Sequence, residues 1–153
     1  MILNEILSEP DDELLLMNLV EYLTTQSNFD IRKLPEVPRN VVAVVTAQAI
    51  IDNGGFRQFF ESEFDGTPDY HLFVEAYEAI GAAESARAIE QALELFPEGR
   101  PPENWVKKEK CIKEIFTGNE GDSLVQNIQG KILGNDRNYQ LTAQYARENL
   151  SGF

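Results

Sequence analysis

The stretch NVVAVVTAQAIIDNGGFRQFF, residues 40–60, decides the fold of this chain. From Asn40 to Asp52, apolar side chains occupy nearly every side of a helix, which is typical of a helix buried all round. Asn53-Gly54-Gly55 follows at once, and these residue types tolerate the positive φ that a sharp change of direction needs. The sequence therefore predicts a buried central helix over residues 40–52 and a tight corner with Gly54 at positive φ.

After the corner, aromatic residues recur at helical spacing. Phe56, Phe59 and Phe60 can send two or three rings into the core, and Gln58 is placed to bond exposed backbone ends at the corner. Paired glycines can also cradle an anion, as phosphate loops do. No lysine follows them and their surroundings are acidic, so the sequence favours a structural role for residues 53–60.

Outward from this stretch, apolar spacing near 3.6 recurs along most of the chain, without a competing period of two. Pro10 and the acids at 11–13 mark one helix start, and residues 27–38 read as a connection. Further helices are expected over residues 69–80, 86–96, 105–116, 124–133 and 137–150. The sequence predicts an all-α fold: a compact, single-domain bundle over residues 1–153, with about seven to nine helices around the buried central helix.

Charge is the strongest compositional signal. The chain has 26 Asp and Glu against 13 Lys and Arg, for a formal charge of −13, and residues 1–31 contain no Lys or Arg. Such a field repels nucleic acid and anionic membranes, and it attracts basic partners in a salt-sensitive way. Direct nucleic-acid binding and membrane binding are therefore not expected. The alternative is that the acids only form solvated faces.

Other function classes find little support. The single His71 and the single Cys111 provide no zinc-type ligand cluster and no internal disulfide. The longest mainly apolar stretch, residues 41–51, is about half of a bilayer span, and the first basic residue, Arg32, comes too late for a secretory signal. We expect a cytoplasmic protein with no cofactor, no metal and no catalytic residues.

Five short motifs occur in a fixed order: Asn53-Gly54-Gly55-Phe56, Gln58-Phe59-Phe60, Ala79-Ile80-Gly81-Ala82, Ala92-Leu93 and Phe96-Pro97. This pattern, strongest over about residues 45–102, resembles the DNA-mimic protein nineteen-like domain family, which is mostly bacterial and largely of unknown function. The resemblance implies an all-helical, often dimeric domain, whose namesake is a negatively charged decoy for a DNA-binding transcription factor. Because the motif residues are mainly apolar or glycine, they define the scaffold and identify no partner contact.

A DNA mimic needs acids from several elements on one surface. Duplex DNA carries one charge per roughly 1.7 Å of axis, whereas carboxylates at i and i+4 of a helix are separated by about 6 Å of rise. The candidate partner-binding residues are Asp11, Asp12, Glu13, Glu61, Glu63, Asp65, Asp69, Glu75, Glu78, Glu90 and Glu94. Residues 61–78 form the densest group, with six acids and no Lys or Arg. The alternative is a polar rim over the neighbouring aromatic residues.

The sequence therefore favours an acidic protein-binding module, a DNA mimic that occupies the basic DNA-binding surface of a transcription factor or other nucleic-acid-binding protein. An immunity- or antitoxin-type inhibitor of a basic toxin would use the same acids. A carboxylate- and metal-dependent hydrolase is a third alternative, against which the single histidine argues. The only basic cluster, between Lys107 and Lys113, is interleaved with acids. It forms a mixed solvated face or pairs with an acidic surface of a second copy in a homodimer.

Overall fold

The computed structural model describes residues 2–28, 30–62, 69–116 and 122–150. In these ranges the chain forms eight α-helices and a 3-10 helix, η1, and no strand. The elements are α1 (Leu3–Leu7), α2 (Asp12–Gln26), η1 (Ile31–Lys33), α3 (Glu36–Glu61), α4 (His71–Ala79), α5 (Ala83–Glu94), α6 (Trp105–Phe116), α7 (Asp122–Gln129) and α8 (Arg137–Leu150). The prediction of an all-α bundle of seven to nine helices is confirmed.

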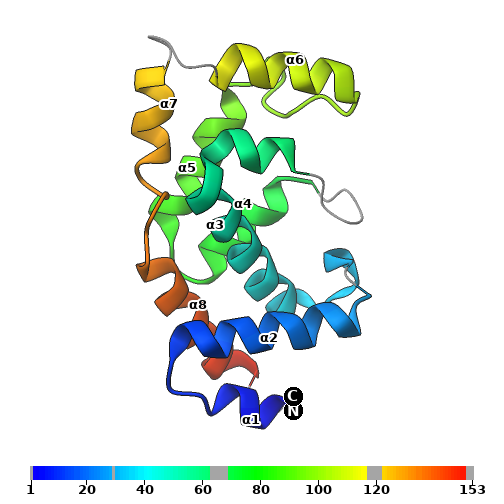
Figure 1. Ribbon diagram of the computed structural model, residues 1–153, viewed down its shortest axis with the longest axis vertical. Helices are drawn as coiled ribbons and strands as arrows, with labels where there is room; N and C mark the ends of the chain where they lie inside the picture. The colour runs from blue at the N-terminus through cyan, green and yellow to red at the C-terminus, as the bar shows by residue number, and fades with distance from the viewer. Residues whose placement is uncertain (1, 29, 63–68, 117–121, 151–153) are drawn as a thin grey trace.

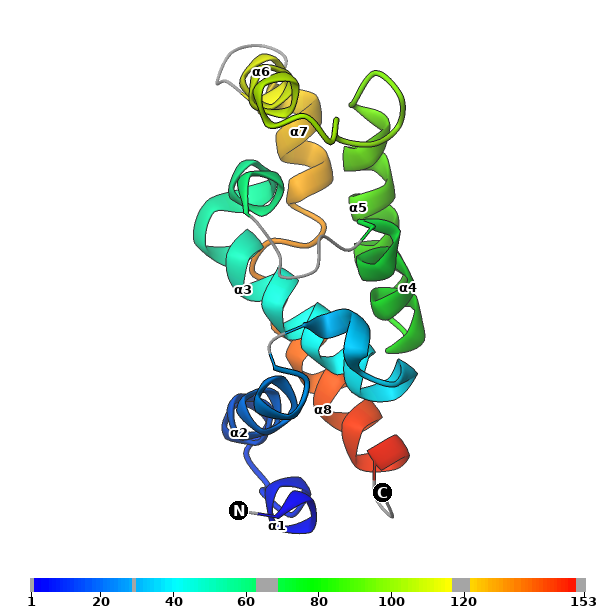
Figure 2. The same ribbon diagram turned by 90° about the vertical axis from the view of Figure 1, so that its right-hand side faces the viewer.

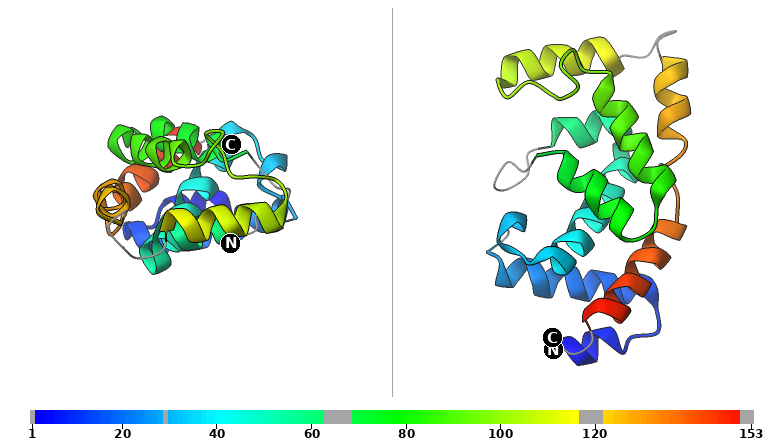
Figure 3. Two further views of the ribbon diagram at one scale, coloured as in Figure 1. Left: turned by 90° about the horizontal axis from the view of Figure 1, so that it is seen from above. Right: turned by 180° about the vertical axis from the view of Figure 1, so that it is seen from behind.

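The long helix α3 occupies the centre of the molecule (Figure 1). It packs against α2 and α8 toward one end and against α4 and α6 toward the other. The helices α4 and α5 pack together as an antiparallel hairpin on the far side of the molecule in Figure 1. The right panel of Figure 3 views the molecule from behind and shows this hairpin in front. The predicted central helix is thus present, and its neighbours cover it on several sides.

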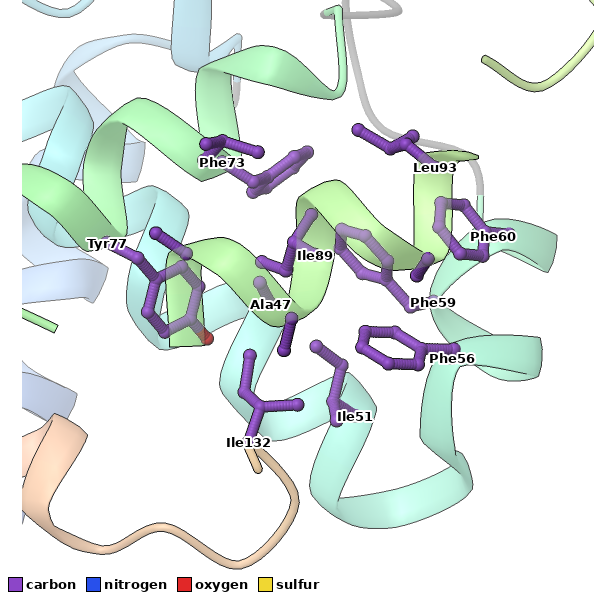
Figure 4. Packing of buried hydrophobic residues seen from close by; sticks show 14 of the residues in the cluster. Ala47, Ile51, Phe56, Phe59, Phe60, Phe73, Tyr77, Ile89, Leu93 and Ile132 are labelled. Carbon is purple, nitrogen blue, oxygen red and sulfur yellow. The ribbon is translucent and has the colours of Figure 1, made fainter. Parts of the chain in front are cut away.

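Two apolar clusters meet along α3. One is aromatic and joins the second half of α3 to α4 and α5 through Phe59, Phe60, Phe73 and Tyr77, all fully buried (Figure 4). The other is rich in leucine and joins α1, α2 and α8 to the first half of α3. Because both clusters draw on α3, its apolar residues must point in several directions, which explains the absence of a single stripe.

The corner after the central helix is a kink within one long helix. Gly54 has φ −144° and ψ 15°, which other residues also adopt, whereas Gly55 has φ 71° and ψ −167°. The prediction that Gly54 has positive φ is therefore wrong, because Gly55 makes the turn. That region of φ and ψ is essentially restricted to glycine, and a Cβ at Gly55 would also collide with the side-chain amide of Gln129.

Several boundaries differ from the sequence prediction. α3 begins at Glu36, so Pro38 lies in its first turn, where a missing N–H costs nothing. α1 was not predicted. α7 ends at Gln129 instead of Leu133, and Gly134 at φ 71° leads the chain toward α8. Trp105, the first residue of α6, is 44% exposed. None of the described helices combines the length and hydropathy of a bilayer crossing.

A candidate partner-binding surface

A buried glutamine fixes the α4–α5 hairpin to α3. The side chain of Gln48 is fully buried. Its Oε1 accepts hydrogen bonds from the Tyr77 hydroxyl (2.9 Å) and from Nδ2 of Asn138 (2.9 Å). Its Nε2 donates to Asp52 Oδ1 (2.9 Å) and to the carbonyl of Ile132 (2.8 Å). Every hydrogen-bonding position of this amide is therefore used, and burial raises the pKa of Tyr77 well above its ordinary value.

The same network reaches the second helix of the hairpin. Nδ2 of Asn138, on α8, also donates to Oγ of Ser85, on α5, at 2.9 Å. Asp52 Oδ1 accepts the backbone N–H of Gly134 at 2.7 Å, which holds the turn before α8. Because both hairpin helices are tied to buried polar groups, the direction in which their outer faces point is fixed by the core. Sequence analysis did not single out Gln48 or Asn138.

The corner motif is connected to α7. The backbone N–H of Phe56 donates to Oε1 of Gln129 at 2.9 Å. Gln58, expected to bond the free backbone at the corner, instead accepts from the side chain of Asn53 at 2.9 Å. The expectation for Gln58 was wrong because Gln129, which is distant in sequence, supplies the acceptor for the backbone N–H of Phe56. Phe56, Phe59 and Phe60 are fully buried, as predicted.

The outer face of the α4–α5 hairpin carries acids from both helices. On the inner sides, Phe73 and Tyr77 of α4 and Ile89 of α5 are fully buried in the aromatic cluster (Figure 4). The outer acids are Glu75, Glu78, Glu84 and Glu94, all exposed, and the half-buried Glu90, and the exposed Arg87 lies among those of α5. Within the described parts of the chain, these five carboxylates form no salt bridge. We call this set the hairpin acidic face.

Four of the predicted partner-binding acids have partners inside the molecule. Glu61 pairs with Arg57 at 2.7 Å, and Asp12 pairs with Arg147 of α8 at 2.8 Å. Asp11 caps α2 by accepting the N–H of Leu14, and Asp69 accepts the N–H of His71 at the start of α4, both at 2.9 Å. These carboxylates therefore help to hold helix ends and helix contacts.

The predicted acids do not all share one face. Asp11, Asp12 and Glu13 lie at the start of α2, which packs against α1, α3 and α8, whereas Glu75 and Glu78 lie on α4, which packs against α3 and α5 (Figure 2). Glu63 and Asp65 lie outside the described residues. Their contribution to a surface over residues 61–78 stays a prediction.

The basic cluster of α6 is engaged locally. Nζ of Lys108 donates to the Tyr70 hydroxyl at 2.9 Å and lies over the rings of Tyr70 and Trp105, at 5.4 and 5.6 Å from their centroids. Burial raises the pKa of Tyr70 to about 12. Lys113 pairs with Glu109 at 3.2 Å. Lys107 and Lys110 are exposed beside Glu109 and Glu114, so α6 carries interleaved acids and bases, and the pairing of this cluster with a second copy stays a prediction.

No chemistry beyond charge emerges from the residues that the structure describes. Across those ranges, no group of three or more His, Cys, Asp or Glu side chains is placed to hold a metal ion. His71 is exposed at the first position of α4, and Cys111 is half-buried against the aromatic cluster. Carboxylates are the most numerous exposed charged groups on the α4–α5 hairpin.

These features define an all-α scaffold in which buried hydrogen bonds join α4 and α5 to α3 and α8, and in which the hairpin carries carboxylates without salt bridges in the described residues. The chain belongs to the DMP19-like protein family, whose model matches residues 32–149. No curated protein and no solved structure matches the chain. The match confirms the resemblance carried by residues 45–102. The family match extends from η1 to the last turn of α8 and leaves α1 and α2 outside the matched region.

Proposed function

We propose that this protein is a DNA mimic that binds the basic DNA-binding surface of a nucleic-acid-binding protein and thereby excludes DNA. The observation that carries the proposal is the hairpin acidic face, in which two antiparallel helices of a DMP19-like scaffold present five carboxylates without internal salt bridges in the described residues. The mode of action is binding and not catalysis.

Two helices raise the charge density above what one can provide. Between Glu84 and Glu94, α5 rises by about 15 Å at roughly 1.5 Å per residue. The neighbouring α4 lies about 8–10 Å away, the usual spacing of packed helices, and adds Glu75 and Glu78. The same length of duplex DNA carries about nine charges, so five carboxylates beside Arg87, five acids less one base for a net charge of −4, reach somewhat less than half of its density. A binding surface of this kind suits a partner that reads phosphates mainly by charge.

The mechanism is competition. Arg and Lys side chains that otherwise contact phosphates form charge-assisted hydrogen bonds with the glutamates. The net charge of −13 accelerates encounter with a basic protein and is screened by salt. Because α4 and α5 are tied to Gln48 and Asn138 in the core, the carboxylates meet the partner on a preformed surface. The proposal includes a cytoplasmic location. It also includes a homodimer, which the family resemblance implies and which analytical ultracentrifugation tests by measuring the mass in solution.

The test is capture followed by competition. The tagged protein is used at low salt to capture binding proteins from its native lysate, and each captured protein is purified and mixed with labelled duplex DNA. We expect at least one basic DNA-binding protein, displaced from DNA by this protein and released as salt rises. Capture of a basic toxin that binds no DNA would favour the inhibitor alternative. Direct binding of duplex DNA by this protein at moderate salt would contradict the proposal.

A further inference from the structure

A groove of about 400 Å³ opens between α1 and α2, at the end of the molecule far from α6 (Figure 2). Its size falls within the range of binding pockets. The lining residues are Ile6, Asn18, Glu21, Tyr22, Thr25 and Gln26. Ile6 and Tyr22 provide apolar walls, and the other four provide amide, hydroxyl and carboxylate groups.

The groove continues along one side of α2. Leu14, Asn18, Tyr22 and Thr25 recur at helical spacing and so lie on one stripe. The opposite side of the helix is buried in the leucine-rich cluster. Leu14 is 41% exposed and the adjacent Met17 is 62% exposed. The groove therefore opens beside apolar side chains that the described part of the molecule does not cover.

A half-buried amide in the groove has no hydrogen-bond partner among the described residues. The side chain of Asn18 forms no hydrogen bond with any residue in the described ranges, although it is half-buried. The hydroxyl of Thr25, by contrast, already donates to the carbonyl of Glu21 at 2.8 Å. Asn18 can therefore offer one donor and one acceptor to the backbone of a bound segment.

Acidic side chains outnumber basic ones around the groove. Residues 1–31 contain seven acids and no Lys or Arg. Asp12 pairs with Arg147 and Asp30 with Arg32. The remaining acids form no salt bridge in the described parts of the chain: Glu5, Glu9, Asp11, Glu13 and Glu21. A segment that binds in the groove therefore meets both carboxylates and exposed apolar side chains on α2.

We propose that the groove between α1 and α2 binds a short, basic, amphipathic segment of a partner protein. One apolar side chain of that segment lies against Tyr22, over a floor to which the almost fully buried Ile6 contributes, its backbone meets Asn18, and a Lys or Arg meets Glu21. An anionic lipid or a nucleic acid is disfavoured by the charge. Because α1 and α2 lie outside the family match at residues 32–149, this site is separate from the hairpin acidic face and does not depend on DNA mimicry.

The test uses a defined probe and the full chain. A synthetic peptide of Leu, Lys and Ala that forms an amphipathic helix is titrated into the isotope-labelled protein and followed by heteronuclear NMR. Two control peptides keep the length: one replaces Leu with Ser and keeps the charge, and the other replaces Lys with Glu and keeps the Leu. We expect saturable shifts at Ile6, Asn18 and Tyr22 with the first peptide only.

Two variants and one matched control locate the site. Thr25→Arg places a like charge in the groove at an exposed position and should weaken binding by about tenfold or more. Glu21→Gln should weaken it about twofold to fivefold, as for an exposed ion pair. Glu114→Gln removes the same charge from the exposed surface of α6, at the far end of the molecule, and should leave peptide binding unchanged.

Any of the following results would overturn the proposal. Equal binding of the Leu and Ser peptides would show attraction by net charge alone. Shifts confined to other helices, or equal effects of Glu21→Gln and Glu114→Gln, would place the peptide elsewhere. Concentration-dependent broadening at α1 and α2 without peptide would make this face a contact between copies of the chain.

Discussion

The backbone N–H of Phe56 donates a hydrogen bond of 2.9 Å to the side chain of Gln129, 73 residues further along the chain. In an unbroken α-helix this N–H would donate to the carbonyl of Asp52. The non-helical dihedral angles of Gly54 and Gly55 interrupt that ladder, and a side chain from α7 replaces the missing acceptor. The kink in the central helix and the position of α7 therefore depend on each other.

Removing the acceptor should destabilise the protein. Gln129→Leu leaves the N–H of Phe56 without its partner, and we expect a loss of about 1–3 kcal/mol in the free energy of unfolding. Gln129→Glu is the control because it retains a carboxylate oxygen at the same place and should cost less. Urea denaturation of the three proteins measures the difference. Equal stability of the Leu variant and the parent would show that the hydrogen bond is dispensable.

The two glycines of the corner should differ in their tolerance of a side chain. Gly55→Ala must place a Cβ at φ 71° and against Gln129, and we expect it to cost about 2–4 kcal/mol. Gly54→Ala keeps a permitted φ, but its Cβ would lie 2.7 Å from Cβ of Gln58, so the helix must shift and we expect a cost of about 1–2 kcal/mol. Thermal and urea unfolding compare the variants. A larger loss at Gly54 would contradict the assignment of the turn to Gly55.

The buried network at Gln48 should contribute more than any single hydrogen bond. Gln48→Met keeps the length of the side chain and removes all four hydrogen bonds, so buried groups on Tyr77, Asn138 and Ile132 lose a partner. We expect a loss of about 3 kcal/mol or more. Tyr77→Phe removes one bond and should cost about 1–2 kcal/mol. If the two variants lose the same stability, the network acts only through Tyr77.

Alkaline pH should unfold the protein through its tyrosines. Burial raises the pKa of Tyr70 to about 12, and burial together with Asp52 raises the pKa of Tyr139 to about 12. Below about pH 10 the folded and unfolded chains both keep these protons, so stability does not change on their account. Between about pH 10 and pH 12 the unfolded chain loses them first, and the free energy of unfolding falls.

Denaturation at a series of alkaline pH values measures this fall. Tyr139→Phe removes one of the protons involved and should flatten the decrease in stability above about pH 10. Ionisation of Tyr70, Tyr77 and Tyr139 at about pH 10 with native circular dichroism would contradict the raised pKa values, because these hydroxyls would then titrate as in the unfolded chain.

The helices could be predicted because their signals are local. The apolar residues of α3 and the aromatic spacing after the corner depend only on neighbours in sequence. The choice between Gly54 and Gly55 could not be predicted, since it depends on Gln129 from another helix. The hydrogen bonds of Gln48 could not be predicted either, because its partners come from α4, from α8 and from the turn before α8.

The acidic surface was only partly predictable for the same reason. Net charge is visible in the sequence, but the pairing of Asp12 with Arg147 joins residues 135 positions apart. Two signals were present and not used. Arg57 and Glu61 stand at i and i+4, the spacing of a helical ion pair, and Glu84 lies opposite the apolar stripe of α5. Both would have shifted the prediction from residues 61–69 toward the hairpin.

The central claim, that the hairpin acidic face competes with DNA, is tested most directly with two triple amide variants of equal charge. The first neutralises three exposed acids of the hairpin: Glu75→Gln, Glu78→Gln and Glu94→Gln. The second neutralises three exposed acids on α3, α6 and α8: Glu36→Gln, Glu114→Gln and Glu148→Gln. Each is measured at several salt concentrations for binding to the captured basic protein and for displacement of that protein from duplex DNA.

We predict that the hairpin triple weakens binding by about tenfold, as expected for three exposed ion pairs, flattens its salt dependence and loses the ability to displace DNA. The matched triple should retain most of its binding affinity, its salt dependence and its ability to displace DNA. Equal losses from both triples would mean that only net charge matters, and an undiminished hairpin triple would contradict the claim that this face meets the partner.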